Sequence, residues 1–391
     1  MNSTLNPSNK EKIAIVAVGY NRIGSLKRLL DSLNNAHYNE SDIPLYISID
    51  ASGNQQLYDY VRDFHWNYGE KIVNIQQERL GLKRHIYQCG DLTKYFKAIV
   101  LLEDDLYVSR YFYDYVKKTV DQYGSDSRIA EISLYRNEYN GYVGLPLTHQ
   151  QTGCDVYLMQ DVSTWGQIWT EKMWLGFKQW LDDHNEEYYQ QVDMPDIIKG
   201  WKKAWSKYYN AYVVDTHKYV LYPSVSLTTN FSDAGVHGGT NNSVVQVNLL
   251  DGPKSFKMDD VDKLVKYDIY YNNESIYEWL KLSKDEVCLD LYGFHNRSHG
   301  EKYILSTLKL PFKIVDQFAL NLRPLELNIK YKIKGKGLYL YDTNHHRSTF
   351  GKVNRYDPLF IEYCLQGFRH KYLIGAAVRY YIKRLIDKIN K

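Results

Sequence analysis

"AIVLLEDDLYVS", residues 98–109, places three neighbouring acids directly after an apolar run. The run 98–102 is short and apolar, which predicts a buried strand. Glu103, Asp104 and Asp105 follow where that strand is expected to end. Adjacent carboxylates repel one another unless a cation neutralises them, so this stretch predicts a binding site as well as a strand.

Three apolar, β-branched segments precede this stretch and alternate with helical patterns. They are residues 12–18, 45–50 and 71–75. This alternation predicts an α/β fold with a mostly parallel central sheet and helices on both faces. Ligands of such sheets lie beyond the carboxyl ends of the strands. Asp50 and Arg22 fall at two such ends, so we expect them to face the same crevice as the acids.

The length of 391 residues exceeds one typical domain. We expect a disordered N-terminus at 1–11, an α/β domain at 12–240, a helical and loop connecting region at 241–300, and a basic C-terminal α+β extension at 301–391. Residues 302–391 hold 18 Lys and Arg against 6 Asp and Glu, a net charge of +12 within a chain of net charge +3. A basic segment of this kind favours an anionic partner, either phospholipid or a polyphosphate carrier; a basic surface that only adds solubility is the alternative.

The last twenty residues predict a helix with an apolar face opposite a basic one. Such a helix can lie on an anionic membrane surface, and packing on its own domain is the alternative. No run approaches the ~18 consecutive apolar residues of a membrane span. The four cysteines lack paired spacing, and the first twelve residues lack an apolar signal core. We therefore expect a cytoplasmic protein, peripheral on the inner face of the membrane if the helix binds lipid, with no nucleic-acid partner.

The acidic triplet favours a hard divalent cation. Mg²⁺ or Mn²⁺ held by one or two carboxylates keeps positions open for substrate phosphates. The alternative is a helix N-terminus decorated with acids, which the helix dipole stabilises.

The stretch VLLEDDLYVSRYF resembles the metal-binding segment of GT-A glycosyltransferases, especially bacterial family 2-type transferases and the eukaryotic N-acetylglucosaminyltransferase that begins complex N-glycans. Over residues 12–240 the order of AVGYNR, SIDASG, ERLGLKRHI, VSTWGQIW and YPSVSLTTNFSDAGVHG also agrees. The resemblance implies a GT-A catalytic domain and a metal-dependent, inverting transferase. It would move a sugar from a nucleotide-diphosphate donor, a UDP-sugar by resemblance, to a glycan or lipid-linked acceptor in bacterial surface polysaccharide synthesis.

The resemblance also implies roles for individual residues. Asp105 would be the direct metal ligand, and His237 would contact the metal or the diphosphate unless it is a surface residue. The donor-binding residues would be Arg22 and Asp50 beside the base, Lys83 and Arg84 at the base or phosphates, Glu103 and Asp104 at the ribose and the metal's water shell, and Trp165 below the sugar. Lys83 and Arg84 could instead form an exposed helix start, and Trp165 could be core packing.

The catalytic base is where the sequence departs from the resemblance. Acids beside a tryptophan are expected, but Gly200 and Ala204 precede Trp201 and Trp205. Asp183 is the first candidate and Asp182 the second, although both could be exposed helix-end residues. Two other functions stay open: a nucleotidyltransferase that makes the nucleotide sugar, and a non-catalytic carbohydrate- or membrane-binding protein that retains the fold.

Overall fold

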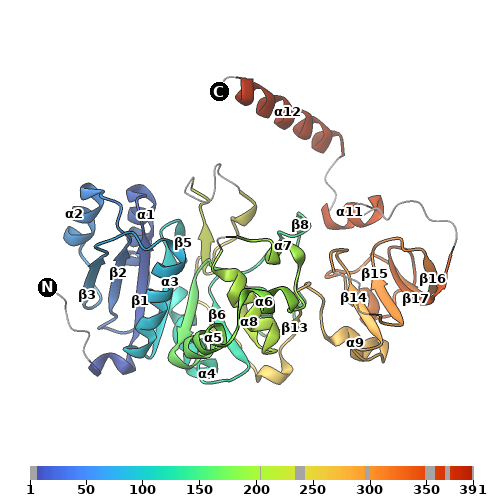
Figure 1. The fold of residues 1–391 in the computed structure, drawn as a ribbon, viewed down its shortest axis with the longest axis horizontal. Helices are drawn as coiled ribbons and strands as arrows, with labels where there is room; N and C mark the ends of the chain where they lie inside the picture. Colours follow the sequence, from blue (N-terminus) through green and yellow to red (C-terminus); the bar gives the residue numbers. More distant parts are fainter. Residues whose placement is uncertain are drawn as a thin grey trace. The chain divides into compact units, whose positions relative to one another are not determined.

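The computed structural model describes residues 7–202, 204–233, 243–295, 300–347, 357–365 and 370–389. Its contacts divide the chain into two compact units (Figure 1). The first unit consists of Met1–Tyr139 and His149–Ser275, and the second of Asn140–Thr148 and Ile276–Lys391. The region expected to connect two domains, 241–300, is therefore shared between the units.

The first half of the large sheet consists of the four strands expected from sequence. All four are parallel and lie in the order β4-β1-β2-β3. Their bounds are β1 Ile13–Gly19, β2 Leu45–Ile49, β3 Lys71–Ile75 and β4 Ala98–Glu103. Because the strands are parallel, the turns after β1, β2, β3 and β4 all lie at one edge, which we call the carboxyl edge.

The second half of the sheet mixes directions. β10 lies between β4 and β6 and is antiparallel to both. The sheet continues through β11, which is parallel to β6, then β9 and β13. These strands are β6 Ile129–Ser133, β9 Val156–Met159, β10 Gln167–Thr170, β11 Tyr219–Pro223 and β13 Lys266–Tyr267. Five of the eight pairings are parallel, so the predicted α/β fold with a mostly parallel sheet is confirmed.

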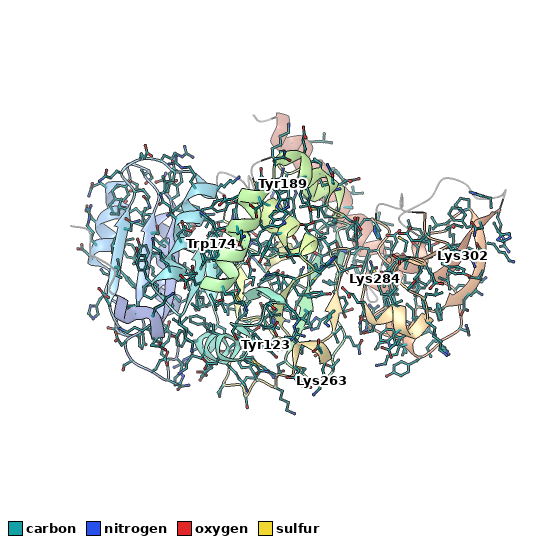
Figure 2. The ribbon with its side chains drawn as sticks, turned by 60° about the horizontal axis from the view of Figure 1, so that its bottom comes forward. Tyr123, Trp174, Tyr189, Lys263, Lys284 and Lys302 are labelled. Atoms are coloured by element: carbon teal, nitrogen blue, oxygen red, sulfur yellow. The ribbon has the colours of Figure 1, made fainter. Side chains whose placement is uncertain are left out.

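Burial explains why β1 is central. All seven of its residues are buried, which requires cover on both faces of the sheet. One face of α1 carries four leucines, Leu26, Leu29, Leu30 and Leu33, which are each at most 1% exposed. Trp174 of α5 (Figure 2) packs so closely on Gly90 that a Cβ there would lie 2.3 Å from the indole. The longer helices are α1 Ile23–Asn34, α2 Gln55–Asp63, α3 Leu82–Gly90, α4 Phe112–Tyr123, α5 Glu171–Asp183 and α8 Ser206–Asp215.

Shorter elements complete the first unit. Pro7–Glu11 forms the 3-10 helix η1, so the prediction of a disordered N-terminus is wrong for these residues; 1–6 lie outside the described residues. The backbone N–H of Lys12 donates to Asn9 O, which ties this helix to the start of β1. The other short elements are η2 Asp91–Lys94, β5 Leu106–Val108, β7 Tyr139–Asn140, β8 Leu145–Pro146, α6 Glu186–Gln191, α7 Asp196–Lys199, β12 Thr228–Asn230, η3 Ser243–Val245 and η4 Val261–Lys263. Of these, β7 ends in the second unit and β8 belongs to it.

The second unit is an α+β structure, as expected for the C-terminal extension. Its four-stranded sheet has the order β14-β15-β17-β16. Cys288, Ile304 and Tyr341 belong to its small core. The strands are β14 Val287–Asp290, β15 Tyr303–Ser306, β16 Phe312–Phe318 and β17 Leu338–His346, and the helices are α9 Ser275–Leu280, α10 Leu327–Lys330, α11 Pro358–Leu365 and α12 His370–Ile389.

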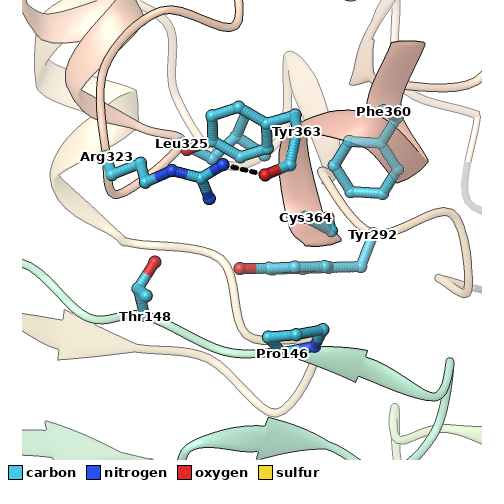
Figure 3. A pocket seen from close by; sticks show the side chains of 8 residues that line it. All are labelled: Pro146, Thr148, Tyr292, Arg323, Leu325, Phe360, Tyr363 and Cys364. Atoms are coloured by element: carbon cyan, nitrogen blue, oxygen red, sulfur yellow. Dashed lines mark hydrogen bonds between the residues drawn. The ribbon is translucent and has the colours of Figure 1, made fainter. Parts of the chain in front are cut away.

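A hollow in the second unit is lined by Tyr292, Phe360 and Tyr363 with Arg323 at its rim (Figure 3). The Arg323 guanidinium lies over the Tyr363 ring at 4.1 Å and donates to the Tyr363 carbonyl. The accessible space is about 10 Å³, which is room for one water molecule. A hollow of this size is too small for a substrate molecule.

Candidate active site

The acids at the end of β4 meet an arginine from the end of β1. The strands pair Val18 with Glu103, so the turns that follow them are neighbours. Arg22 Nε lies 3.3 Å from Asp104 Oδ2, and Nη2 bonds to the other oxygen of the same carboxylate. Nη2 also lies 3.1 Å from Asp105 Oδ2. Arg22 and the acidic triplet therefore converge at the carboxyl edge, as the sequence predicts.

A second segment, which sequence reasoning missed, holds the triplet from the other side. β12 pairs with β5, and the backbone N–H of Phe231 donates to Asp105 O at 2.9 Å. Asn230 Nδ2 lies 3.3 Å from Asp105 Oδ1. The carbonyl of Asp233 accepts from Arg22 Nη1 at 3.0 Å. These residues belong to the quoted stretch YPSVSLTTNFSDAGVHG, but their contact with the triplet has no local signal because the pairing joins residues far apart in sequence.

Asp233 ties this segment to helix α1. Its carboxylate accepts from Ser25 Oγ at 2.7 Å and pairs with Arg28. The Arg28 guanidinium also lies 3.8 Å from the centre of the Phe231 ring. These contacts position the residues that face Asp105.

Negative charge is in excess at the triplet. Burial, and then the charges of Asp105 and Asp104, raise the pKa of Glu103 to about 8. Burial also raises the pKa of Asp104 to about 6, although the hydrogen bond and charge of Arg22 oppose the shift. One arginine thus faces three carboxylates. Such a site favours an additional cation.

The residues present fit a divalent cation that completes its coordination with substrate oxygens. Among the described residues, no three His, Cys, Asp or Glu side chains form a group that could hold a metal. Mg²⁺ is commonly bound by one or two carboxylates plus phosphates and water, and Asp105 with Glu103 nearby matches that donor set. Arg22 competes for the same Asp105 oxygen. His237, the other predicted metal contact, lies outside the described residues.

Asp50 directly follows β2 and is 4% exposed. Its two carboxylate oxygens accept from three backbone N–H groups, of Ala51 at 2.9 Å, Leu80 at 2.8 Å and Gly81 at 2.9 Å. Asp50 therefore fixes the loop after β3 at the carboxyl edge. Its predicted contact with a uracil N–H stays a prediction.

Lys83 and Arg84 follow this loop at the start of α3. Lys83 Nζ lies 4.0 Å from the centre of the Tyr208 ring, and burial lowers its pKa. Arg84 lies 3.6 Å from Glu78, with both side chains exposed. Neither contacts the triplet, so their predicted roles at the base or phosphates stay predictions.

The three turns after β1, β2 and β3 carry polar groups that sequence reasoning missed. The Arg79 guanidinium lies 4.8 Å from the centre of the Tyr20 ring. Asn54 Nδ2 donates to Asn21 Oδ1 at 2.9 Å, which joins the first two turns. An aromatic ring beside a guanidinium is a surface on which a planar base can stack.

Trp165 is half-buried in the loop between β9 and β10. Its ring meets Tyr135 edge-on with centroids 4.7 Å apart, and its carbonyl accepts from Thr228 Oγ1 at 2.6 Å. Core packing and a place beside a sugar are both compatible with this position. A role below the donor sugar stays a prediction.

The two predicted bases lie at the end of α5. Asp182 and Asp183 are exposed and line an open surface hollow with His184, Asn185 and Tyr188. Within the part of the chain that the structure describes, neither makes a hydrogen bond or ion pair with the triplet or with Arg22. The structure therefore brings Arg22, Glu103, Asp104 and Asp105 together, and leaves Asp182 and Asp183 outside that cluster.

No protein-family model matches the chain, and no curated protein matches it. Among solved structures, the chain is similar to S. aureus TarS 1-349 in complex with UDP-GlcNAc, with 13% identity over 58% of this chain and 60% of that one and a TM-score of 0.39. It is also similar to GalNAc-T7 with UDP, GalNAc and Mn²⁺, with 14% identity over 55% of this chain and 43% of that one and a TM-score of 0.37.

A third similar structure is the mannosyltransferase PcManGT of Pyrobaculum calidifontis in complex with GDP-Man and Mn²⁺. The identity is 14% over 34% of this chain and 37% of that one, with a TM-score of 0.26. The chain spans less than two thirds of each of these structures. Similarity at this level does not assign an activity to this chain.

Proposed function

We propose that this protein is a metal-dependent glycosyltransferase of the GT-A type. It would move a sugar from a nucleotide-diphosphate donor, a UDP-sugar by sequence resemblance, to a glycan or lipid-linked acceptor in bacterial surface polysaccharide synthesis. The convergence of Glu103, Asp104, Asp105 and Arg22 at the carboxyl edge of a mostly parallel sheet carries the proposal.

Charge supports this chemistry. A nucleotide diphosphate gains negative charge as it leaves, and a divalent cation bound at Asp105 would offset that charge. Arg22 holds Asp104 and Asp105 in place before a donor binds. If Asp105 held a divalent cation, the guanidinium donor of Arg22 that now contacts Asp105 would be available to a phosphate oxygen.

Direct displacement with inversion requires a base that takes the proton of the acceptor hydroxyl. Asp183, then Asp182, remain the proposed bases. Their exposure at the end of α5 favours a second candidate function, a non-catalytic carbohydrate-binding protein that retains the donor site. Hydrolysis of the UDP-sugar distinguishes the transferase from the binding protein, because a binding protein would bind the UDP-sugar without hydrolysing it.

We also propose that helix α12 docks on an anionic membrane surface, which would place the protein at the cytoplasmic face of the membrane. Eight large apolar or aromatic side chains of this helix are 51–65% exposed: Tyr372, Ile374, Val378, Tyr380, Tyr381, Ile382, Leu385 and Ile386. Arg379 and Lys383 are exposed on the same helix. Among the described residues, no helix has the length and apolar content needed to cross a bilayer. An exposed apolar face with basic residues suits binding in the plane of the interface.

The transferase is tested by measuring UDP or GDP release from a panel of nucleotide sugars, with Mn²⁺ and with a chelator. We expect release from one UDP-sugar that requires Mn²⁺ or Mg²⁺. Binding of UDP-sugar without any release, in the presence of a glycan panel, would support the binding protein instead. Failure of every nucleotide to bind would refute both functions.

A further inference from the structure

A second polar cluster lies beyond the carboxyl end of β6. We call it the Arg136 cluster, and it consists of Arg136, Glu138, His149 and Tyr157. Ser226 Oγ accepts from the Arg136 backbone N–H at 2.9 Å and fixes that residue. Arg136 Nη1 lies 3.2 Å from Glu138 Oε1, and these side chains are 26% and 30% exposed. The pair therefore remains open to solvent.

His149 and Tyr157 are buried members of the cluster, at 5% and 2% exposure. Their rings stack with centroids 4.1 Å apart, and Tyr157 stacks in turn on Tyr222. Burial, and then the charge of Arg136, lower the pKa of His149 to about 3. The imidazole is thus neutral, and the guanidinium is within electrostatic reach of it.

Three polar atoms of this cluster have no hydrogen-bond partner within the described part of the chain. They are Arg136 Nε, His149 Nδ1 and Tyr157 Oη, and all three are buried. With the Gln151 amide placed to donate to His149 Nε2 at 2.9 Å, the ring proton lies on Nδ1. The Asn137 backbone N–H can only donate to Tyr157 Oη, so the phenol proton of Tyr157 has no acceptor among the described residues.

Unmatched buried donors are costly, because each loses the water it would otherwise bind. Three of them in one cluster indicate that a group rich in acceptor oxygens belongs there. Charge argues against an anion: Glu138 neutralises Arg136, and Asp161 adds a second negative charge near Tyr157. A hydroxyl group provides an acceptor oxygen without adding negative charge. Its oxygen can accept from the unmatched donors, and its proton can be donated to Glu138.

We propose that the Arg136 cluster binds hydroxyl groups of a sugar ring of the acceptor, which rests on the proposed transferase function. β6 is separated from β4 by one strand, so two strand spacings, about 10 Å, lie between the ends of these strands. Tyr135, next to Arg136, packs on Trp165, the residue proposed to lie below the donor sugar. The cluster therefore adjoins the donor site without sharing its residues.

Saturation-transfer NMR on the full chain with Mn²⁺ and UDP tests this site. The probes are the methyl glycosides of glucose, galactose, mannose and N-acetylglucosamine. We expect at least one to bind, and Tyr157→Phe and Arg136→Lys to weaken its affinity about tenfold while leaving UDP affinity unchanged. Tyr222→Phe is the matched control, because it removes a hydroxyl of the same ring stack that donates to Asp161 O at 2.8 Å.

Equal glycoside affinity in Tyr157→Phe and the unmodified protein would overturn the proposal, and so would UDP binding with no glycoside bound. A crystal structure in which a single water contacts all three donors, unchanged by glycoside, would identify a buried water site instead. Glycoside binding that depends on Tyr157, without any binding of UDP, would preserve the sugar site and refute the transferase.

Discussion

Arg22 Nη2 lies 3.1 Å from Asp105 Oδ2, although 83 residues separate the two along the chain. The same guanidinium is bonded to Asp104, whose side chain is 7% exposed. An arginine therefore supplies part of the positive charge that three adjacent carboxylates require. A divalent cation with a diphosphate would supply the remainder.

Asp105→Ala should reduce turnover of the nucleotide sugar to below about one hundredth, because it removes the carboxylate proposed to hold the metal. Mn²⁺-dependent UDP binding, measured by calorimetry, should be lost with it. Asp121→Ala is the control, since Asp121 pairs with Lys97 at the exposed surface. Full activity of Asp105→Ala would show that the metal lies elsewhere.

Arg22→Ala should lower the free energy of unfolding by roughly 3 kcal/mol, because it leaves the buried Asp104 carboxylate without its partner. Urea denaturation measures this change. Asp104→Asn introduced into Arg22→Ala should recover part of the loss, since the uncompensated charge is then gone. If the two substitutions were additive, Arg22 and Asp104 would not be coupled.

Glu131 predicts a pH dependence of stability. Burial raises its pKa from 4.5 to about 8, although Gln167 and Trp169 donate hydrogen bonds to it. Between these two values the unfolded chain has lost the proton and the folded chain keeps it. The contribution of Glu131 to stability is therefore complete below pH 4.5 and falls by up to about 1.4 kcal/mol per pH unit as pH rises toward 8.

Glu131→Gln should remove that part of the slope, because the amide stays neutral and can still accept from Trp169. Thermal unfolding of both proteins from pH 5 to pH 8 measures the difference. The same slope in both would mean that Glu131 is ionised in the folded protein.

Gly90→Ala should destabilise the protein by about 1–3 kcal/mol, because its Cβ would lie 2.3 Å from the Trp174 indole. Gly24→Ala is the control: nothing lies within 4 Å of a Cβ at that helical position. We expect Gly24→Ala to change the melting temperature little or to raise it. Similar melting temperatures for the two variants would contradict the close packing of α3 on α5.

Deleting residues 372–391 should abolish sedimentation with vesicles that contain phosphatidylglycerol, because it removes the exposed apolar and basic side chains of α12. Neutral phosphatidylcholine vesicles should bind the full chain more weakly. Leu385→Glu should act like the deletion, whereas Tyr372→Phe should have no effect. Undiminished binding of the deletion variant would place any lipid contact in another part of the chain.

Local patterns in the sequence were enough to predict the four parallel strands and the position of the acids at the end of β4. Apolar runs of strand length and the residues that end them are local features, so they can be read without knowing any distant contact. The basic helix near the end of the chain was predictable for the same reason, because its residues share faces at helical spacing.

Which side chains contact one another depends on long-range packing and could not be predicted from local patterns. Asn230 reaches Asp105 because β12 pairs with β5, and Arg22 reaches Asp104 because β1 pairs with β4. The stacking of His149 on Tyr157 and the exposure of Asp183 likewise depend on how distant segments pack. Local patterns indicate where polar residues follow an apolar strand. The burial of each side chain and its hydrogen-bond partners depend on the pairing of distant segments. Burial and partners in turn set the charge and chemistry of each site.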